Sequence, residues 1–205
     1  YGDMAGTDIV INAAGAPQGL IADRMEMLPK NIELIKQFAA QVKQYCPDAF
    51  VITATNPVDP LNYAMHLAGG FDRRKLIGYS INDSFRFREM LASAYGVKVS
   101  QVDGLVIGEH GSTQVLLFST ATIDGKKVTV DEKTKADIRS EVPNILKRYE
   151  AFKAGRTAGW TCAVGLEIIT RAIKENSGAV MQRLLLLNGE HGRIALGLPV
   201  CVELG

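Results

Sequence analysis

The chain has 205 residues, of which 47% are hydrophobic and 22% are charged, and its formal net charge is +1 at pH 7. This composition is ordinary for a globular protein with one large domain or two small ones. The near-neutral charge argues against a nucleic-acid or anionic-membrane partner, because both require a basic surface. No apolar run approaches the length of about 20 residues that a membrane span needs, so no membrane association is expected.

The cysteines and the chain ends indicate the setting of the protein. The three cysteines, Cys46, Cys162 and Cys201, are scattered, odd in number and without metal-ligand spacing. We therefore expect no metal site and a reduced, cytoplasmic location. The sequence begins at Tyr1 without a signal-peptide pattern and stops just after an apolar segment. Both ends of the sequence resemble breaks within a domain, so we expect a chain that is incomplete at its N- and C-terminus.

The first half of the chain alternates short apolar strands with amphipathic helices. Strands are predicted at 8–14, 49–57 and 75–80, and helices at 23–46, 59–69 and 83–96. Pro29 is expected to kink the first of these helices or to start a second one. Asp83 or Ser84 is the predicted start of the helix at 83–96, and Gly96 lies past its end. This order is typical of a doubly wound parallel sheet of the α/β class.

The second half changes character near residue 83. Its apolar segments predict antiparallel strands, with turns at Asp124-Gly125 and Asn188-Gly189. Helices are expected at 131–153 and at about 160–175. The predicted organisation is therefore part of a Rossmann-type parallel sheet in residues 1–82, followed by an α+β domain in residues 83–205.

Polar side chains gather after the predicted strands, where open α/β sheets bind their ligands. They are Gln18, Arg24, Asn56, Asp83, Arg86 and His110. An arginine fork suits a carboxylate, and a histidine paired with an aspartate suits proton transfer. Such a set would fit the reduction of a carbonyl group that lies next to a carboxylate.

Four motifs in order resemble the lactate/malate dehydrogenase family: "AAGAP…DRMEMLPKN", "TATNPVDPLNY", "NDSFRFREML" and "GEHGSTQV". The resemblance covers essentially the whole chain. It implies a dinucleotide-binding domain, a substrate domain, NAD as cofactor, and reversible hydride transfer between NADH and a 2-oxo acid. It also implies a homo-dimer or homo-tetramer.

The resemblance implies a role for each matching catalytic residue. His110 would be the general acid–base, and Asp83 would orient its imidazole and stabilise the cation. Arg24, on a loop that closes, would polarise the substrate carbonyl. Arg86 would hold the substrate carboxylate.

The same resemblance implies the binding residues. Asn56 would bind the substrate and help to place the nicotinamide, and Pro57 would follow a cis peptide bond. The implied cofactor contacts are Ala14, Gly15, Ala16, Asn31, Ala54, Thr55 and Asn56. The chain has only two further histidines. His191, in the second "GEHG", is expected in a surface turn, and His66 in a helix without a chemical role.

The substrate is predicted from Gln18, six positions before Arg24. In this family an arginine at that position pairs with the second carboxylate of oxaloacetate or malate. A neutral amide leaves that carboxylate unpaired, which is costly, and favours pyruvate and L-lactate. Malate dehydrogenase remains the alternative, because another arginine could take this place.

One expected motif is missing from the sequence. The family opens with a glycine-rich GxGxxG turn that receives the pyrophosphate, and this sequence has none. Two hypotheses follow: the chain is part of a working dehydrogenase, or it is an inactive fragment that cannot hold NAD.

Overall fold

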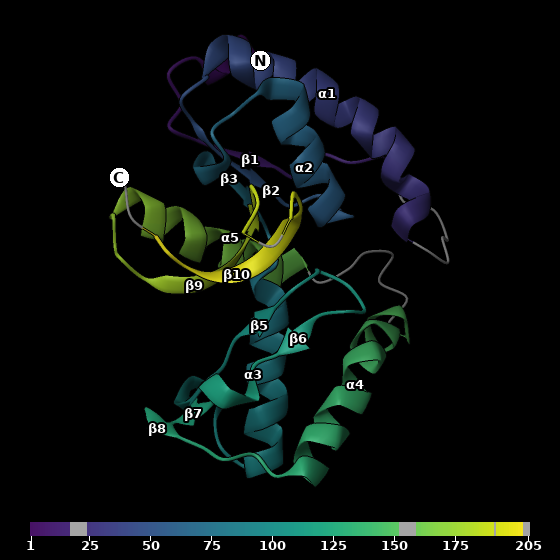
Figure 1. Ribbon diagram of the computed structural model, residues 1–205, viewed down its shortest axis with the longest axis vertical. Helices are drawn as coiled ribbons and strands as arrows, with labels where there is room; N and C mark the ends of the chain where they lie inside the picture. Colours follow the sequence, from purple (N-terminus) through teal and green to yellow (C-terminus); the bar gives the residue numbers. More distant parts are fainter. Residues whose placement is uncertain (17–23, 152–158, 191, 203–205) are drawn as a thin grey trace. The chain divides into compact units, whose positions relative to one another are not determined.

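Two compact units make up the computed structural model, which describes residues 1–16, 24–151, 159–190 and 192–202 (Figure 1). Unit 1 comprises Tyr1–Ser80 and Arg183–Leu198. Unit 2 comprises Ile81–Gln182 and Pro199–Gly205. The predictions for Gln18 and His191 fall outside the described residues.

Unit 1 is built on parallel strands, as the sequence predicts. Strands β1 (Ile9–Asn12), β2 (Phe50–Thr53) and β3 (Leu76–Gly78) pair in parallel, in the order in which they occur in the chain. A short 3-10 helix, η1 (Gly2–Met4), precedes them. β1 is an edge strand of the sheet, and its Ile11 is 43% exposed.

Two later strands extend this sheet, which the sequence does not reveal. β9 (Val180–Leu186) pairs antiparallel with β3, and β10 (Ala195–Cys201) lies next to β9, so that the order is β1-β2-β3-β9-β10. The sequence predicts strands in this region and a turn at Asn188-Gly189, where Gly189 has a φ of 119°. It does not show that β9 joins a sheet whose neighbouring strand lies a hundred residues earlier.

The helices of unit 1 bury one apolar face each. The 3-10 helix η2 (Arg24–Met27) leads into α1 (Leu28–Tyr45), and Pro29 lies in the first turn of α1, where proline is tolerated. This matches the predicted second helix start. α2 (Val58–Gly69) packs against α1. The core shared by these helices and the sheet contains Val10, Ile35, Ala39, Val42, Val51, Leu61, Met65 and Leu76.

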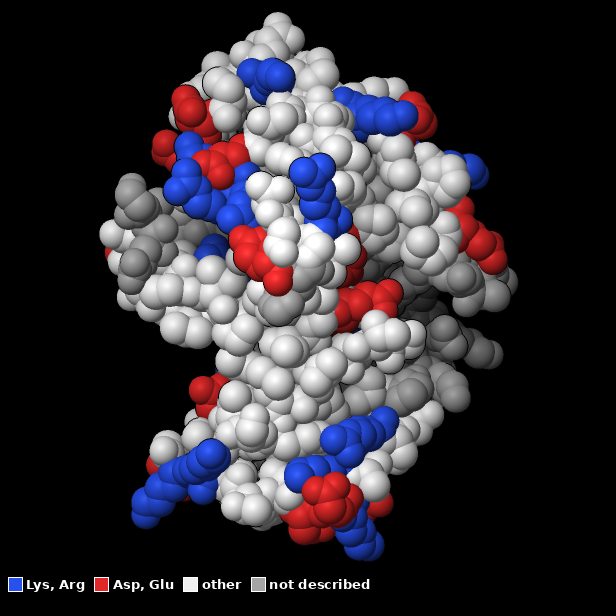
Figure 2. All heavy atoms as spheres, viewed as in Figure 1, with Lys and Arg blue, Asp and Glu red and all other residues white. Residues whose placement is uncertain are grey.

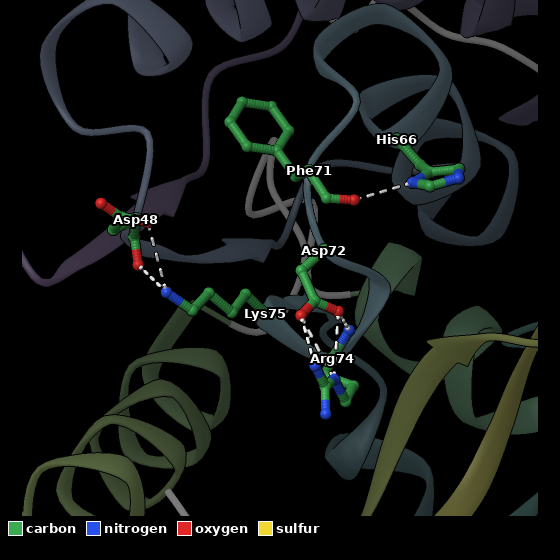
Figure 3. Close-up of polar contacts among 6 residues, drawn as sticks. All are labelled: Asp48, His66, Phe71, Asp72, Arg74 and Lys75. Atoms are coloured by element: carbon green, nitrogen blue, oxygen red, sulfur yellow. Dashed lines mark hydrogen bonds and ion pairs between the residues drawn. The ribbon is translucent and has the colours of Figure 1, made fainter. Parts of the chain in front are cut away.

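Polar contacts fix the connection between α2 and β3 (Figure 3). Gly70 ends α2 in the left-handed conformation, with a φ of 64°. The His66 ring lies with Nδ1 3.0 Å from the Phe71 carbonyl oxygen, so this histidine has a structural contact. Asp72 accepts hydrogen bonds at the start of η3 (Arg73–Lys75), and the Arg74 guanidinium holds the pKa of the Asp72 carboxyl below its usual range.

Unit 2 is arranged around helix α3 (Ile81–Tyr95). Short elements follow in the chain: η4 (Val99–Gln101), β4 (Val102–Asp103), β5 (Val106–Ile107), β6 (Val115–Leu116), η5 (Phe118–Thr120), β7 (Thr122–Ile123) and β8 (Lys126–Lys127). Helices α4 (Glu132–Ala151) and α5 (Gly159–Lys174) come next. Helix α3 contacts β4, β5, α4 and α5. The core of the unit includes Phe87, Leu91, Val106, Phe118 and Ile138, and Phe87 meets Phe118 edge-on at 5.1 Å.

Two sequence predictions in unit 2 have different outcomes. The turn at Asp124-Gly125 is confirmed, because both residues have positive φ angles, 49° and 72°, between the antiparallel strands β7 and β8. The predicted start of α3 at Asp83 or Ser84 is wrong, because the helix begins at Ile81. Asp83 and Ser84 are buried inside the helix and form tertiary hydrogen bonds in place of a cap.

Charged side chains of both signs are intermingled on the face shown in Figure 2. Among the described residues, no helix is long and apolar enough to cross a membrane.

The start of α4 supplies a pH-dependent contribution to stability. Asp131 accepts hydrogen bonds from the backbone N–H of Thr134 at 2.9 Å and from its hydroxyl at 2.7 Å. These two bonds, the backbone one first, hold the pKa of the Asp131 carboxyl below its usual range. The stabilisation is therefore complete above the unfolded-state pKa of about 3.9, and it is lost as the pH falls through the lower folded-state value.

Asp131→Ala is expected to lower the thermal midpoint of the protein near neutral pH, and this effect should shrink as the pH falls below about 3.9. Asp131→Asn, which keeps an acceptor but does not titrate, is the matched control. Its difference from wild type should be smaller near neutral pH than that of the alanine variant. An alanine effect that is the same at every pH would contradict this account of the cap.

Candidate active site

The carboxyl ends of β1 and β2 carry two turns that lie against each other. Ala54 donates its backbone N–H to the Asn12 carbonyl at 2.8 Å, which continues the pairing of the two strands. The Thr55 hydroxyl donates to the Ala14 carbonyl at 2.7 Å. Ala14 in turn donates its N–H to the side-chain oxygen of Asn12 at 3.2 Å. Short side chains and backbone groups therefore form this edge of unit 1.

The side chain of Asn31 in α1 forms hydrogen bonds to both turns. Its side-chain oxygen accepts from the Ala16 N–H at 2.7 Å, and its amide nitrogen donates to the Asn56 carbonyl at 2.8 Å. Asn31 is only 1% exposed. Sequence reasoning assigns Asn31 to the cofactor; in the structure its amide holds the loops that carry the other candidates. The peptide bond before Pro57 is cis, as the sequence predicts.

The turn after β1 consists of small residues, most of which are exposed. Ala14 and Gly15 are exposed, and Ala16 is half-buried. A Cβ added at Gly15 would lie 2.8 Å from Cγ2 of Thr55, so that only glycine fits without a shift. This turn lies at the carboxyl end of a parallel strand, which is where open α/β sheets bind their ligands.

The candidate acid–base pair lies within unit 2. The Nδ1 of His110 is 2.5 Å from Oδ2 of Asp83, and the side chains are 11% and 3% exposed. The two residues are far apart in the sequence, one in the first turns of α3 and one in the connection between β5 and β6. A carboxylate on Nδ1 fixes the ring orientation and favours the tautomer that has its proton on Nδ1. Nε2 is then the ring nitrogen suited to exchange a proton with a ligand.

Arg86 lies one turn after Asp83 on α3. Its Nη1 is 3.3 Å from Oδ1 of Asp83, and the arginine side chain is 22% exposed. Asp83 therefore lies between a guanidinium and an imidazole. The guanidinium of Arg86 has further N–H donors, which can bind the carboxylate of a ligand in bidentate geometry.

The structure brings the predicted residues together in two groups. Asp83, Arg86 and His110 meet in unit 2, and Ala14, Gly15, Ala16, Asn31, Ala54, Thr55 and Asn56 meet in unit 1. Arg24 is the first residue of η2, and its side chain lies outside what the structure describes. Within the described ranges, no group of three or more histidine, cysteine or acidic side chains could hold a metal ion.

Sequence reasoning missed two polar contacts beside this pair. Asn82 donates to the Cys162 sulfur at 3.1 Å, which ties the start of α3 to α5. The Ser84 hydroxyl contacts both β5 and β9. Their position next to Asp83 in "INDSF" was the available signal, because polar residues on the buried face of a helix require partners.

Comparison with known proteins assigns the family. Residues 1–78 match the family model described as lactate/malate dehydrogenase, NAD binding domain. Residues 82–192 match the model described as lactate/malate dehydrogenase, alpha/beta C-terminal domain. The chain belongs to the lactate/malate dehydrogenase family. The resemblance read from the motifs is therefore confirmed, as is the α/β fold class with its Rossmann-type sheet and α/β second part.

The relatives that the chain matches include both malate dehydrogenases and L-lactate dehydrogenases. The chain is 33% identical over 207 residues to a malate dehydrogenase of Natronomonas pharaonis, covering 98% of this chain and 66% of that protein. It is 31% identical over 211 residues to an L-lactate dehydrogenase of Staphylococcus aureus, covering 99% of this chain and 67% of that protein. The chain thus spans about two thirds of the length of its curated relatives.

A solved structure of the family has a closely similar fold. The lactate dehydrogenase of Cryptosporidium parvum, in complex with lactic acid and nicotinamide adenine dinucleotide, superimposes with a TM-score of 0.92 at 28% sequence identity. The match covers 99% of this chain and 67% of that one.

Proposed function

We propose that the protein is an NAD-dependent 2-hydroxy acid dehydrogenase that interconverts a 2-oxo acid and its L-2-hydroxy acid. The contact between His110 and Asp83 carries this proposal, because it supplies an oriented proton donor beside an arginine suited to a carboxylate. The family assignment supports it.

Each residue of the candidate site would have its own role in the reaction. Bound NADH would supply the hydride to the carbonyl carbon of the substrate. Protonated His110 would donate its Nε2 proton to the carbonyl oxygen, and Asp83 would stabilise the imidazolium and hold the ring in place. Arg86 would bind the substrate carboxylate through its fork of donors. In the reverse direction neutral His110 would remove the hydroxyl proton.

The remaining roles are also proposals. Arg24 would polarise the carbonyl, and Asn56 would bind the substrate and the nicotinamide. Ala14, Gly15 and Ala16 would contact the cofactor, with Asn31, Ala54 and Thr55 in the same edge of the sheet. We also propose that residues 1–82 act as the cofactor domain and residues 83–205 as the substrate domain, except that Arg183–Leu198 belong to unit 1.

We infer that pyruvate and L-lactate are the preferred substrate pair. Gln18 cannot form an ion pair with a second carboxylate, so a dicarboxylate would lose the partner that an arginine would provide. Malate dehydrogenase is the second candidate, and the relative from Natronomonas pharaonis favours it. A homo-oligomer in the cytoplasm fits the family, and the described cysteines form no disulfide.

Gln18→Arg is expected to shift the ratio of kcat/KM for oxaloacetate over pyruvate upward on the order of 10²-fold, because the new charge would pair the second carboxylate. The measurement is NADH oxidation with both 2-oxo acids in the wild type and in the variant. Gln37→Arg, on an exposed position of α1, adds the same charge as a control. A wild-type preference for oxaloacetate would favour the malate reading.

A further inference from the structure

A buried hydroxyl group connects three segments of unit 2, namely α3, β5 and the start of β9, where Gln182 still belongs to this unit. Ser84 is completely buried in α3. Its Oγ donates to Oε1 of Gln182 in β9 at 3.1 Å and accepts from the backbone N–H of Val106 in β5 at 3.0 Å. Gln182 is 1% exposed and Val106 is fully buried. One hydroxyl therefore satisfies groups on two different strands.

The strand that Ser84 holds leads directly to the candidate acid–base. β5 ends at Ile107, three residues before His110. β5 pairs with β6 through Val106↔Leu116 and Ile107↔Val115, so residues 108–114 form a closed connection between paired strands. Gly108 begins this connection at a φ of 93°. The position of the imidazole therefore depends on where β5 is fixed relative to α3.

The other partner of the pair is the neighbour of Ser84 in the chain. Asp83 precedes Ser84 in α3, so a single segment of helix contacts His110 through Asp83 and the strand before His110 through Ser84. A serine on a buried face of a helix is unfavourable unless its hydroxyl is paired, since an unpaired buried hydroxyl costs free energy. The hydroxyl here is paired on both sides.

We propose that Ser84 is a positioning residue for the pair His110–Asp83. In this role, Gln182 orients the Ser84 hydroxyl, and the hydroxyl holds the backbone N–H of Val106. This inference rests on the proposed function only for its effect on the reaction. The geometric part does not depend on a substrate or cofactor: without the Ser84 hydroxyl, β5 loses the hydrogen bond that ties Val106 to α3 directly beside Asp83.

The first test measures the imidazole itself and requires no substrate. ¹⁵N spectra of the three histidine rings, assigned with His66→Gln and His191→Gln, report which nitrogen of His110 carries the proton. The wild type should show one tautomer, protonated at Nδ1. Ser84→Ala should give a mixture of tautomers or a broadened His110 signal. An unchanged His110 signal in a folded Ser84→Ala variant would overturn the proposal.

A second variant and two controls separate positioning from stability. Gln182→Met, of similar volume but without the amide, should perturb the same signal, and it takes the place of Ser84→Ala if that variant does not fold. Thr170→Val removes a buried hydroxyl of the same unit for which the described residues provide no hydrogen-bond partner. Ile138→Ala lowers the stability of the same core. Neither control should change the His110 tautomer, and an equal change in Ile138→Ala would show a merely structural role.

The kinetic readout distinguishes this inference from the proposed function. With NADH and pyruvate, Ser84→Ala should lower kcat by about 10- to 10²-fold, because small misplacements of a catalytic group cost that much, while KM for pyruvate stays near the wild-type value. A perturbed His110 signal with no wild-type activity on either pyruvate or oxaloacetate would support the positioning role and overturn the dehydrogenase proposal. Wild-type activity with unchanged kcat in Ser84→Ala would overturn the positioning role alone.

Discussion

Asp83→Asn is expected to lower kcat for pyruvate reduction by about 10²- to 10⁴-fold, the range that an oriented general acid–base contributes. The carboxylate is 3% exposed and 2.5 Å from Nδ1 of His110, so the amide would replace an acceptor that both orients the ring and stabilises its cation. An amide can present its NH₂ to Nδ1, which favours the wrong tautomer. The measurement is steady-state NADH oxidation, together with a check that the variant is folded.

The control for this prediction is another carboxylate that is paired with an arginine. Asp72→Asn removes an acid whose partner is Arg74, on an exposed part of unit 1, and should leave kcat unchanged. His110→Gln should cost at least as much as Asp83→Asn. The double variant should be little worse than His110→Gln alone, because residues that act as one unit are not additive. Additive losses would mean that the two side chains act separately.

Asn31→Leu is expected to lower both the stability of the protein and its affinity for NADH. The amide links the Ala16 N–H and the Asn56 carbonyl, and its removal leaves both backbone groups without that partner. A buried group left unpaired costs about 1–3 kcal/mol of the free energy of unfolding, and these two partly buried groups should each cost less than that. Because both groups belong to the loops after β1 and β2, the affinity for NADH should fall as well. Urea unfolding and NADH fluorescence titration measure the two effects.

Asn31→Asp tests the two hydrogen bonds of the Asn31 side chain separately. A carboxylate still accepts from Ala16 but cannot donate to Asn56, so it separates the acceptor function from the donor function. Asn144→Leu is the control, because its amide donates to the Ser140 carbonyl on the exposed side of α4. This control should change stability by only a few tenths of that caused by Asn31→Leu. Unchanged stability in Asn31→Leu would show that the loops are held by other contacts.

The parts of the structure that the sequence predicts are those whose residues form a pattern among neighbours in the chain. Apolar strands ended by small residues indicated β1 and β2, and the positive φ angles at Asp124 and Gly125 agree with the turn predicted there. The residues that meet at Asp83 came from motif order, which places His110 after the helix that carries the aspartate. Both kinds of inference rest on neighbours in the chain or on the family pattern.

The unpredicted parts depend on contacts between distant segments. The Ser84 hydroxyl bonds to a side chain 98 residues away, and nothing in the local sequence distinguishes this from a helix cap. The start of α3 was misplaced for the same reason, because serine and aspartate are both good caps. β9 is a recognisable strand, but its pairing with β3 depends on which sheet edge is available in the folded unit.

Transfer of a labelled hydride tests the central claim most directly. The protein is incubated with pyruvate and with NADH deuterated at C4 of the nicotinamide, and the lactate formed is analysed by mass spectrometry. We expect lactate that carries one deuterium at C2, formed by the wild type and at least about 10²-fold more slowly by His110→Gln. If the wild type transfers no deuterium to pyruvate or to oxaloacetate, or if His110→Gln transfers it at the wild-type rate, the proposed reaction and its acid–base pair are contradicted.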